Sequence, residues 1–217
     1  MSIKENILHV KKEIENARIK GAKQKKVDLI VVTKERQNNE ITEILKYGEN
    51  KLGENKVQEL EEKAPSFPNA KWHFIGHLQS NKAKTAVELC ELIHSVDSVK
   101  LLRRINEVAR EIDKVQKVLL EVNVSGEETK FGFKPQELAG VLDTLKQLPF
   151  QNIEINGLMT MAPLIDAEKT RPYFKALYNL GQELYLHELS MGMSNDYIVA
   201  VQEGATMTRV GTAIFGK

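Results

Sequence analysis

Short apolar runs alternate with amphipathic stretches along most of the chain. The apolar runs are rich in β-branched residues, which is typical of strands buried in a parallel sheet. We therefore expect strands at Leu29–Lys34, Lys51–Glu54, Trp72–Gly76, Leu92–Val96, Lys117–Val124, Ile155–Met161, His187–Met191 and Thr208–Phe215. Between them, apolar residues recur at helical spacing. This spacing predicts helices at Glu40–Tyr47, Val57–Lys63, Asn81–Leu89, Val99–Ile112, Pro135–Gln147, Ala167–Tyr185 and Asp196–Glu203.

A further helix precedes the first strand. Ser2 and Glu5 have the spacing of a capping box, and the apolar residues that follow predict a helix from about residue 3 to Lys20. About eight β/α units then follow, which favours an α/β fold with a single (β/α)8 TIM barrel and an extra N-terminal helix. An open doubly wound sheet is the alternative. Because 217 residues are fewer than the roughly 250 typical of this barrel, we expect short loops and one domain over residues 1–217.

The composition gives no indication of nucleic-acid or membrane binding. Lys and Arg number 31 and Asp and Glu number 30, so no net charge attracts a polyanion. The basic segment Lys20–Lys26 lacks interleaved aromatic residues and is interpreted as a solvated loop. No apolar run reaches the length of a membrane span, and the N-terminus has no signal-peptide pattern. The single cysteine, Cys90, lies in an apolar helical pattern, which indicates a buried thiol in a cytoplasmic protein.

The first predicted strand stops at Lys34. A lysine at the end of an apolar strand is partly desolvated, and desolvation favours the neutral, nucleophilic amine. Lysines of this kind form Schiff bases with carbonyl compounds. The alternative is that Lys34 only ends the strand and extends its amine into water, as most lysines in such positions do.

Small and hydroxyl-bearing residues follow the last two predicted strands. In a (β/α)8 barrel the strand ends form the active face, and phosphate is often bound there by the loops after strands seven and eight. We expect Ser194 to begin the last long helix, where its hydroxyl can cap the helix and donate to a phosphate oxygen. Gly211 lets the backbone approach an anion closely, and Thr212 adds a hydroxyl. Taken separately, Ser194 is only a helix cap and Gly211 only a tight turn; taken together, they indicate a phosphate pocket opposite Lys34.

Arg209 lies in the last predicted strand as a permanent cation. Inside a barrel it needs a partner, which is either a carboxylate of the protein or an acceptor on a ligand. If the acceptor is a pyridine nitrogen, Arg209 keeps that nitrogen unprotonated and weakens the ring as an electron sink.

Two other motifs are weaker. His73 and His77 are four residues apart, which on a strand is about 13 Å and too far for one metal ion. Gly192-Met193-Ser194 resembles the start of the nucleophile elbow of serine hydrolases, but Asp196 replaces the last glycine of that motif. No histidine follows Ser194 to act as its base. We therefore expect neither a metal site nor a serine hydrolase.

Six ordered motifs carry a resemblance that extends over essentially the whole chain. They resemble the YggS/PROSC family, the pyridoxal phosphate homeostasis proteins, in VVTK (31–34), GENKVQE (53–59), WHFIGHLQSNK (72–82), GLMTMAP (157–163), LSMGMSND (189–196) and RVGTAIFG (209–216). The resemblance implies a fold-type III barrel for pyridoxal 5′-phosphate (PLP), similar to the N-terminal domain of alanine racemase. It implies that Lys34 holds PLP as an aldimine, and that the protein contributes to PLP homeostasis without established catalytic turnover.

The resemblance also implies places for other side chains. Asn55 and His77 would border the cofactor, and Arg209 would face its pyridine nitrogen. The phosphate would be surrounded by Ser190, Ser194, Gly211 and Thr212. Lys130 matches a lysine at the barrel mouth that assists loading or release of PLP.

Two alternatives to a PLP carrier stay open. One is a small, racemase-like PLP enzyme acting on amino acids, and the other is an aldolase in which Lys34 attacks a sugar phosphate directly. The related racemases take a second base from an additional C-terminal domain, and we expect none beyond Lys217. With the electron sink also weakened by Arg209, we expect no enzymatic activity, and we expect apo PLP-dependent enzymes to receive the cofactor.

Overall fold

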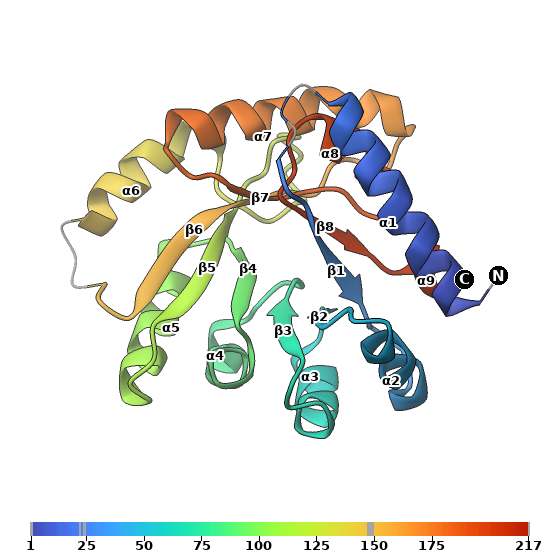
Figure 1. Cartoon of the computed structure of the whole chain (residues 1–217). Coiled ribbons are helices and arrows are strands. Elements are labelled where there is room, and N and C mark those ends of the chain that lie inside the picture. Colours follow the sequence, from blue (N-terminus) through green and yellow to red (C-terminus); the bar gives the residue numbers. More distant parts are fainter. Residues whose placement is uncertain (1, 22, 24, 147–149, 217) are drawn as a thin grey trace.

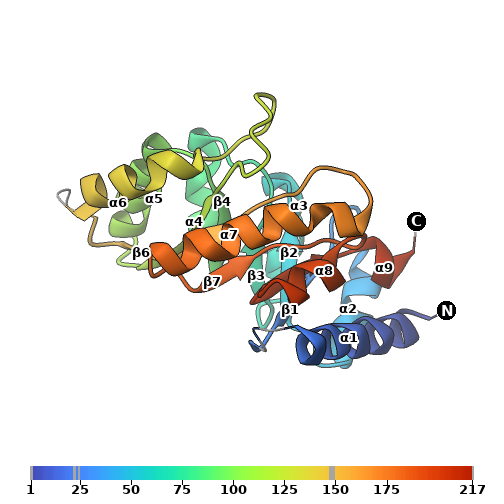
Figure 2. The same cartoon turned by 90° about the horizontal axis from the view of Figure 1, so that it is seen from above.

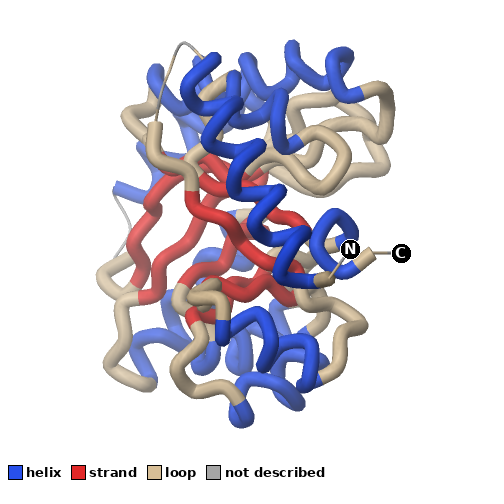
Figure 3. The backbone as a smooth tube through the Cα atoms, turned by 45° about the vertical axis from the view of Figure 1, so that its right-hand side comes forward, coloured by secondary structure: helices blue, strands red, loops and turns tan. Residues whose placement is uncertain are grey.

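Eight parallel strands pair in chain order and close into a barrel, the last strand pairing with the first (Figures 1 and 3). The structure is a computed structural model that describes residues 2–21, 23, 25–146 and 150–216. The strands are β1 (Asp28–Val32), β2 (Lys51–Glu54), β3 (Lys71–Phe74), β4 (Leu92–Val96), β5 (Gln116–Glu121), β6 (Ile153–Met159), β7 (Glu188–Ser190) and β8 (Met207–Val210). The closed barrel confirms the expected fold, and the open sheet is excluded.

Helices surround the barrel, and the extra N-terminal helix α1 packs against the two C-terminal helices (Figures 1 and 2). They are α1 (Ile3–Lys20), α2 (Asn38–Lys46), α3 (Val57–Lys63), α4 (Ala83–Leu89), α5 (Val99–Glu111), α6 (Leu138–Lys146), α7 (Arg171–Glu183), α8 (Tyr197–Gln202) and α9 (Thr212–Phe215). The capping box predicted for α1 is present: the Ser2 hydroxyl accepts from the Glu5 N–H, and the Glu5 carboxylate accepts from the Ser2 N–H. Among the described residues, every helix is too short or too polar to cross a bilayer.

The last predicted strand, Thr208–Phe215, is wrong in its second half. Strand β8 ends at Val210, and the following residues form the short helix α9. The N–H groups of Ile214 and Phe215 both donate to the Gly211 carbonyl, so the chain turns into a helix directly after the strand. The apolar residues of this segment satisfy either periodicity over so few positions, which is why the sequence pattern does not separate strand from helix here.

The observed ends of other strands and helices differ from the predicted ends by fewer residues. Strand β5 ends at Glu121 rather than Val124, and β7 ends at Ser190 rather than Met191. The predicted helix at Asn81–Leu89 begins with a 3₁₀ turn at Ser80–Lys82. The end of the predicted helix Pro135–Gln147 lies outside the described residues, as do the chain ends at Met1 and Lys217.

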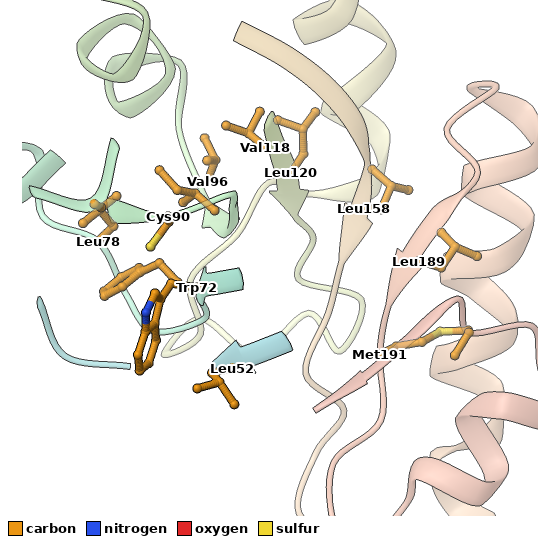
Figure 4. Packing of buried hydrophobic residues seen from close by; sticks show 14 of the residues in the cluster. Leu52, Trp72, Leu78, Cys90, Val96, Val118, Leu120, Leu158, Leu189 and Met191 are labelled. Carbon is orange, nitrogen blue, oxygen red and sulfur yellow. The ribbon is translucent and has the colours of Figure 1, made fainter. Parts of the chain in front are cut away.

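The hydrophobic core has two parts, because side chains alternate between the two faces of each strand. The larger part lies between the outer face of the barrel and the helices, and Figure 4 shows some of its members, including Leu120, Leu158 and Leu189. A smaller, separate cluster fills the barrel interior with Ile30, Leu92, Leu119, Met159 and Met207. Cys90 is 1% exposed in the larger part, and burial raises the pKa of its thiol to about 12, as expected for a small core residue.

Candidate functional site

A cavity of about 360 Å³ opens at the carboxyl ends of the strands. Its volume lies within the range of roughly 300–1,000 Å³ that is usual for small-molecule sites. Seven of the eight residues predicted for the site line it together: Lys34, Asn55, His77, Ser194, Arg209, Gly211 and Thr212. They come from five different strand ends, and barrel closure brings them together. The eighth, Ser190, is fully buried and does not line the cavity.

Lys34 follows β1 at the cavity wall, two residues beyond Val32. Its preceding residue, Thr33, is fully buried, whereas Lys34 itself is exposed. Our expectation of a partly desolvated lysine is therefore wrong, because the residue is exposed where it lines the cavity. Among the described residues, no carboxylate lies within ion-pair distance of the Lys34 amine, so the amine is available to a ligand in the cavity.

The loops after β7 and β8 are joined by Ser194. Its Oγ accepts hydrogen bonds from the backbone N–H groups of Gly211 (3.2 Å) and Ala213 (3.3 Å) at the start of α9. We expected Ser194 to cap the last long helix, but Asp196 occupies the N-cap of α8, and its Oδ1 accepts from the Met193 N–H at 2.7 Å. Ser194 instead ties the loop after β7 to the start of α9, so that its hydroxyl and that of Thr212 lie at one end of the cavity. We call this the anion-binding end, because hydroxyl groups can donate to an anion.

Arg209 is 3% exposed at the cavity floor. One guanidinium nitrogen donates to Ser190 Oγ at 2.5 Å and another to the Thr160 carbonyl at 2.9 Å. Among the described residues, no carboxylate forms a salt bridge with Arg209. The structure therefore does not contain the internal ion pair that was one of the two predicted partners. Burial lowers the pKa of Arg209 to about 10, which leaves the group protonated at neutral pH.

Two buried histidines extend the hydrogen-bond network that begins at Arg209 and Ser190. Ser190 Oγ lies 2.8 Å from His94 Nδ1, and His94 Nε2 lies 2.8 Å from His73 Nδ1. Burial lowers the pKa of both imidazoles, that of His73 to about 4, so both rings are neutral at pH 7. Because Ser190 is fully buried in this chain of contacts, its structural role is to hold Arg209, and the contact with phosphate implied by the family resemblance does not fit its position.

Asn55 and His77 both line the cavity. The Asn55 carbonyl oxygen Oδ1 is buried, and no group of the described chain donates to it. The His77 ring stacks on Phe131, with ring centroids 3.8 Å apart, and its Nδ1 lies 3.2 Å from Asp97. An unpaired buried acceptor costs free energy, so Asn55 favours a ligand that donates to it.

Lys130 lies in the loop after β5, which projects from the barrel in Figure 2. Its amine forms an ion pair with Glu127 at 2.7 Å, and Lys130 does not line the cavity. The neighbouring Phe131 does, and this aromatic residue was missed by the sequence analysis.

Glu121 was also missed, because the predicted strand ended at Val124, whereas Glu121 is the last residue of β5 and so lies at the active face. It is 4% exposed and lines the cavity. Burial, together with the negative charge of Asp97, raises the pKa of Glu121 to about 7, and the charge of Arg209 opposes this only in part. The site therefore contains a carboxyl group that changes charge near neutral pH.

The described residues contain no cluster of histidine, cysteine and carboxylate side chains that could hold a metal ion. Around the cavity mouth the lining side chains are instead apolar and exposed: Phe131, Met161, Leu164, Ile165 and Met193.

A closed (β/α)8 barrel with Lys34 after its first strand and hydroxyl-bearing loops after its last two strands has the architecture of the alanine racemase N-terminal-domain class. The model of that family, described as "Alanine racemase, N-terminal domain", matches residues 4–217. A relative from Aquifex aeolicus is 43% identical over 186 residues, which cover 82% of this chain and 81% of the relative. A relative from Vibrio cholerae is 36% identical over an alignment that covers 100% of this chain and 96% of the relative. Both relatives are named pyridoxal phosphate homeostasis protein, and the chain belongs to this family.

Solved structures agree with this assignment. PipY of Synechococcus elongatus PCC7942 without PLP has a TM-score of 0.89 and 37% identity, and the match covers 99% of this chain and 100% of PipY. The PipY structure with PLP bound has a TM-score of 0.85. Alanine racemase of Clostridium difficile has a TM-score of 0.74 at 15% identity, which shows that the barrel fold is shared.

Proposed function

We propose that the chain is one PLP-binding barrel domain in the cytoplasm, that Lys34 is the residue to which PLP attaches, and that the protein serves PLP homeostasis. The single observation that supports this most is the position of the Lys34 amine on the same cavity as the anion-binding end and Arg209. The names of the relatives and the PLP-bound PipY structure support the same cofactor.

The residues present fit PLP at each of its polar groups. The hydroxyls of Ser194 and Thr212, which line the same end of the cavity as Gly211, suit a phosphate dianion. The buried, unpaired Asn55 Oδ1 offers an acceptor to a hydroxyl on the ring. Arg209 stays protonated and would donate to the pyridine nitrogen, since its neighbours Ser190 and Thr160 occupy only part of its donor capacity.

When bound, PLP supplies an aldehyde carbon that a lysine amine can capture with loss of one water molecule. Lys34 provides that amine, and the open mouth of the cavity allows water to leave and exchange. By donating to the ring nitrogen, Arg209 would keep this nitrogen unprotonated, which would weaken the ring as an electron sink. This favours a carrier without turnover, whose bound PLP is released to apo PLP-dependent enzymes.

One observation favours a second candidate function, a PLP enzyme acting on amino acids. Glu121 lines the cavity, and its raised pKa of about 7 matches the requirement for a general acid or base at neutral pH. Following exchange of the α-hydrogen of amino acids with solvent deuterium separates the two functions. Sustained exchange at enzymatic rates would overturn the carrier proposal, and we expect none.

The attachment site is tested by adding PLP, reducing with borohydride and mapping the labelled peptide. We expect a visible absorption band before reduction and a pyridoxyl group on Lys34 afterwards. Lys34→Ala should lose both, while Lys56→Ala, which removes an exposed lysine outside the cavity lining, should keep them. A label on Lys130, or unchanged labelling of Lys34→Ala, would contradict the proposal.

A further inference from the structure

A buried ion pair lies directly behind the segment that carries Lys34. Lys63, near the end of α3, has a side chain that is 9% exposed, and Glu59, one turn earlier, is 18% exposed. The Lys63 amine lies 2.7 Å from Glu59 Oε2. Neither residue lines the cavity, and neither belongs to the site predicted from the sequence.

Each member of this pair binds one of the two peptide groups that flank Lys34. The Lys63 amine donates to the Thr33 carbonyl at 2.8 Å, which fixes the peptide before Lys34. Glu59 Oε2 accepts from the Glu35 N–H at 2.7 Å, which fixes the peptide after it. The backbone on both sides of Lys34 is therefore anchored to the same ion pair.

The anchored backbone is not in a relaxed conformation. Glu35 has a φ of 60°, in the left-handed region that residues with a side chain rarely adopt. Such a conformation persists when surrounding contacts hold it, and here Glu59 provides the contact. Strain of this kind is common where a functional side chain must take one direction.

A second carboxylate, that of Glu54, completes the contacts around Lys63. Glu54 Oε1 accepts from Lys63 at 2.8 Å and from the Thr33 hydroxyl at 2.6 Å. Burial raises the pKa of Glu54, against the opposing effect of Lys63. Burial also disfavours the charge of Glu59, but hydrogen bonds from Lys63 and the Glu35 N–H outweigh this effect and lower the pKa of Glu59. Lys63 thus faces two carboxyl groups whose pKa values shift in opposite directions, that of Glu54 upward and that of Glu59 downward.

We propose that the Lys63–Glu59 ion pair is a positioning device that holds the Thr33–Glu35 backbone so that the Lys34 amine points into the cavity. This inference rests on the proposed attachment of PLP at Lys34. Precise placement of a nucleophile lowers the barrier to its reaction, and a displacement of about 1 Å slows a reaction by about a hundredfold. Loss of the ion pair therefore slows covalent attachment while leaving the binding of the phosphate and ring largely intact.

The test compares Lys63→Met and Glu59→Gln with wild type, with Lys56→Met as the matched control. Lys56 is also a lysine near Glu59, at 3.8 Å, but it is 57% exposed and makes no contact with the Thr33 carbonyl. Three quantities are measured: the rate constant of covalent attachment of PLP from its absorbance, the Kd of pyridoxine 5′-phosphate, which has no aldehyde, and amide hydrogen exchange of Glu35 in the ligand-free protein.

We expect Lys63→Met to slow attachment by about ten- to a hundredfold, to change the Kd of the aldehyde-free analogue by less than about twofold, and to accelerate exchange of the Glu35 amide. Lys56→Met should match wild type in all three, and Lys63→Arg should recover part of the rate. Unchanged attachment, or equal losses in attachment rate and analogue affinity, would overturn the proposal. If Lys63→Met does not fold, the same three measurements on Glu59→Gln test the role of the ion pair.

These measurements distinguish failure of the positioning role from failure of the proposed PLP attachment at Lys34. If wild type shows no attachment of PLP at Lys34, the proposed function fails. Hydrogen exchange of the Glu35 amide then still tests whether the ion pair holds the Thr33–Glu35 backbone. If Lys63→Met and Glu59→Gln both leave this exchange rate unchanged, the proposed positioning role is also overturned.

Discussion

Glu121 allows a quantitative test of the electrostatics of the cavity. Its carboxyl group is 4% exposed, and burial with the charge of Asp97 raises its pKa from 4.5 to about 7. In the unfolded chain the group ionises near its ordinary value. The folded state therefore binds a proton that the unfolded state has already released between these two pH values, and stability falls as the pH rises through this window.

The magnitude follows from the shift. A change of about 2.5 pKa units, at 1.36 kcal/mol per unit, corresponds to at most about 3 kcal/mol of stability lost above pH 7. Glu121→Gln keeps the shape of the side chain and removes the ionisation. We expect the free energy of unfolding of this variant, relative to wild type, to rise by about 2–3 kcal/mol between pH 5 and pH 8.

Urea unfolding of the ligand-free protein at both pH values measures this difference. The control is Glu128→Gln, which removes an exposed carboxylate from the loop after β5, where water screens the charge. A difference between Glu121→Gln and wild type that stays constant from pH 5 to pH 8 would refute the reasoning, because it would mean that burial does not hold Glu121 protonated.

Three further substitutions test other features. Gly76→Ala would place a Cβ 2.1 Å from the backbone carbonyl oxygen of Asn55, so we expect the free energy of unfolding in urea to fall by about 1–3 kcal/mol and PLP binding to weaken. An unchanged Kd for PLP would contradict the place of Asn55 in the cavity wall. Ser194→Ala removes the acceptor for two backbone N–H groups and should weaken PLP affinity about tenfold in calorimetry, whereas equal affinity would count against the anion-binding end. Gly140→Ala in α6, where a Cβ meets nothing within 4 Å, should stabilise the fold by about 0.5–1 kcal/mol without affecting PLP; destabilisation would contradict the helix there.

Much of the fold could be read from local patterns. The period of apolar residues distinguishes the strand at Leu29–Lys34 from the helix that begins near Asn38, because a strand buries residues on both faces and a helix buries one stripe. The count of β/α units then favours a closed barrel. The same reasoning failed at Thr212–Phe215, where four residues are too few for either period to be recognised.

The candidate site could be predicted where a residue's role depends on its position at a strand end. Lys34, Ser194 and Arg209 line one cavity because all carboxyl ends of a parallel barrel lie at the same side. Their detailed environments did not follow from this rule. Lys34 is exposed rather than desolvated, and Ser194 binds the start of α9 rather than capping α8.

The sequence by itself determined the order of strands and helices and the side of the barrel that carries the chemistry, because these depend on periodicities within short segments. The tertiary structure alone decided the partners of each polar group. Lys63 binds the Thr33 carbonyl 30 residues away, and Ser190 contacts His94 at a separation of 96 residues. Such contacts, and the burial that raises the pKa of Glu121, form only when distant strands close around one interior, so no local pattern encodes them.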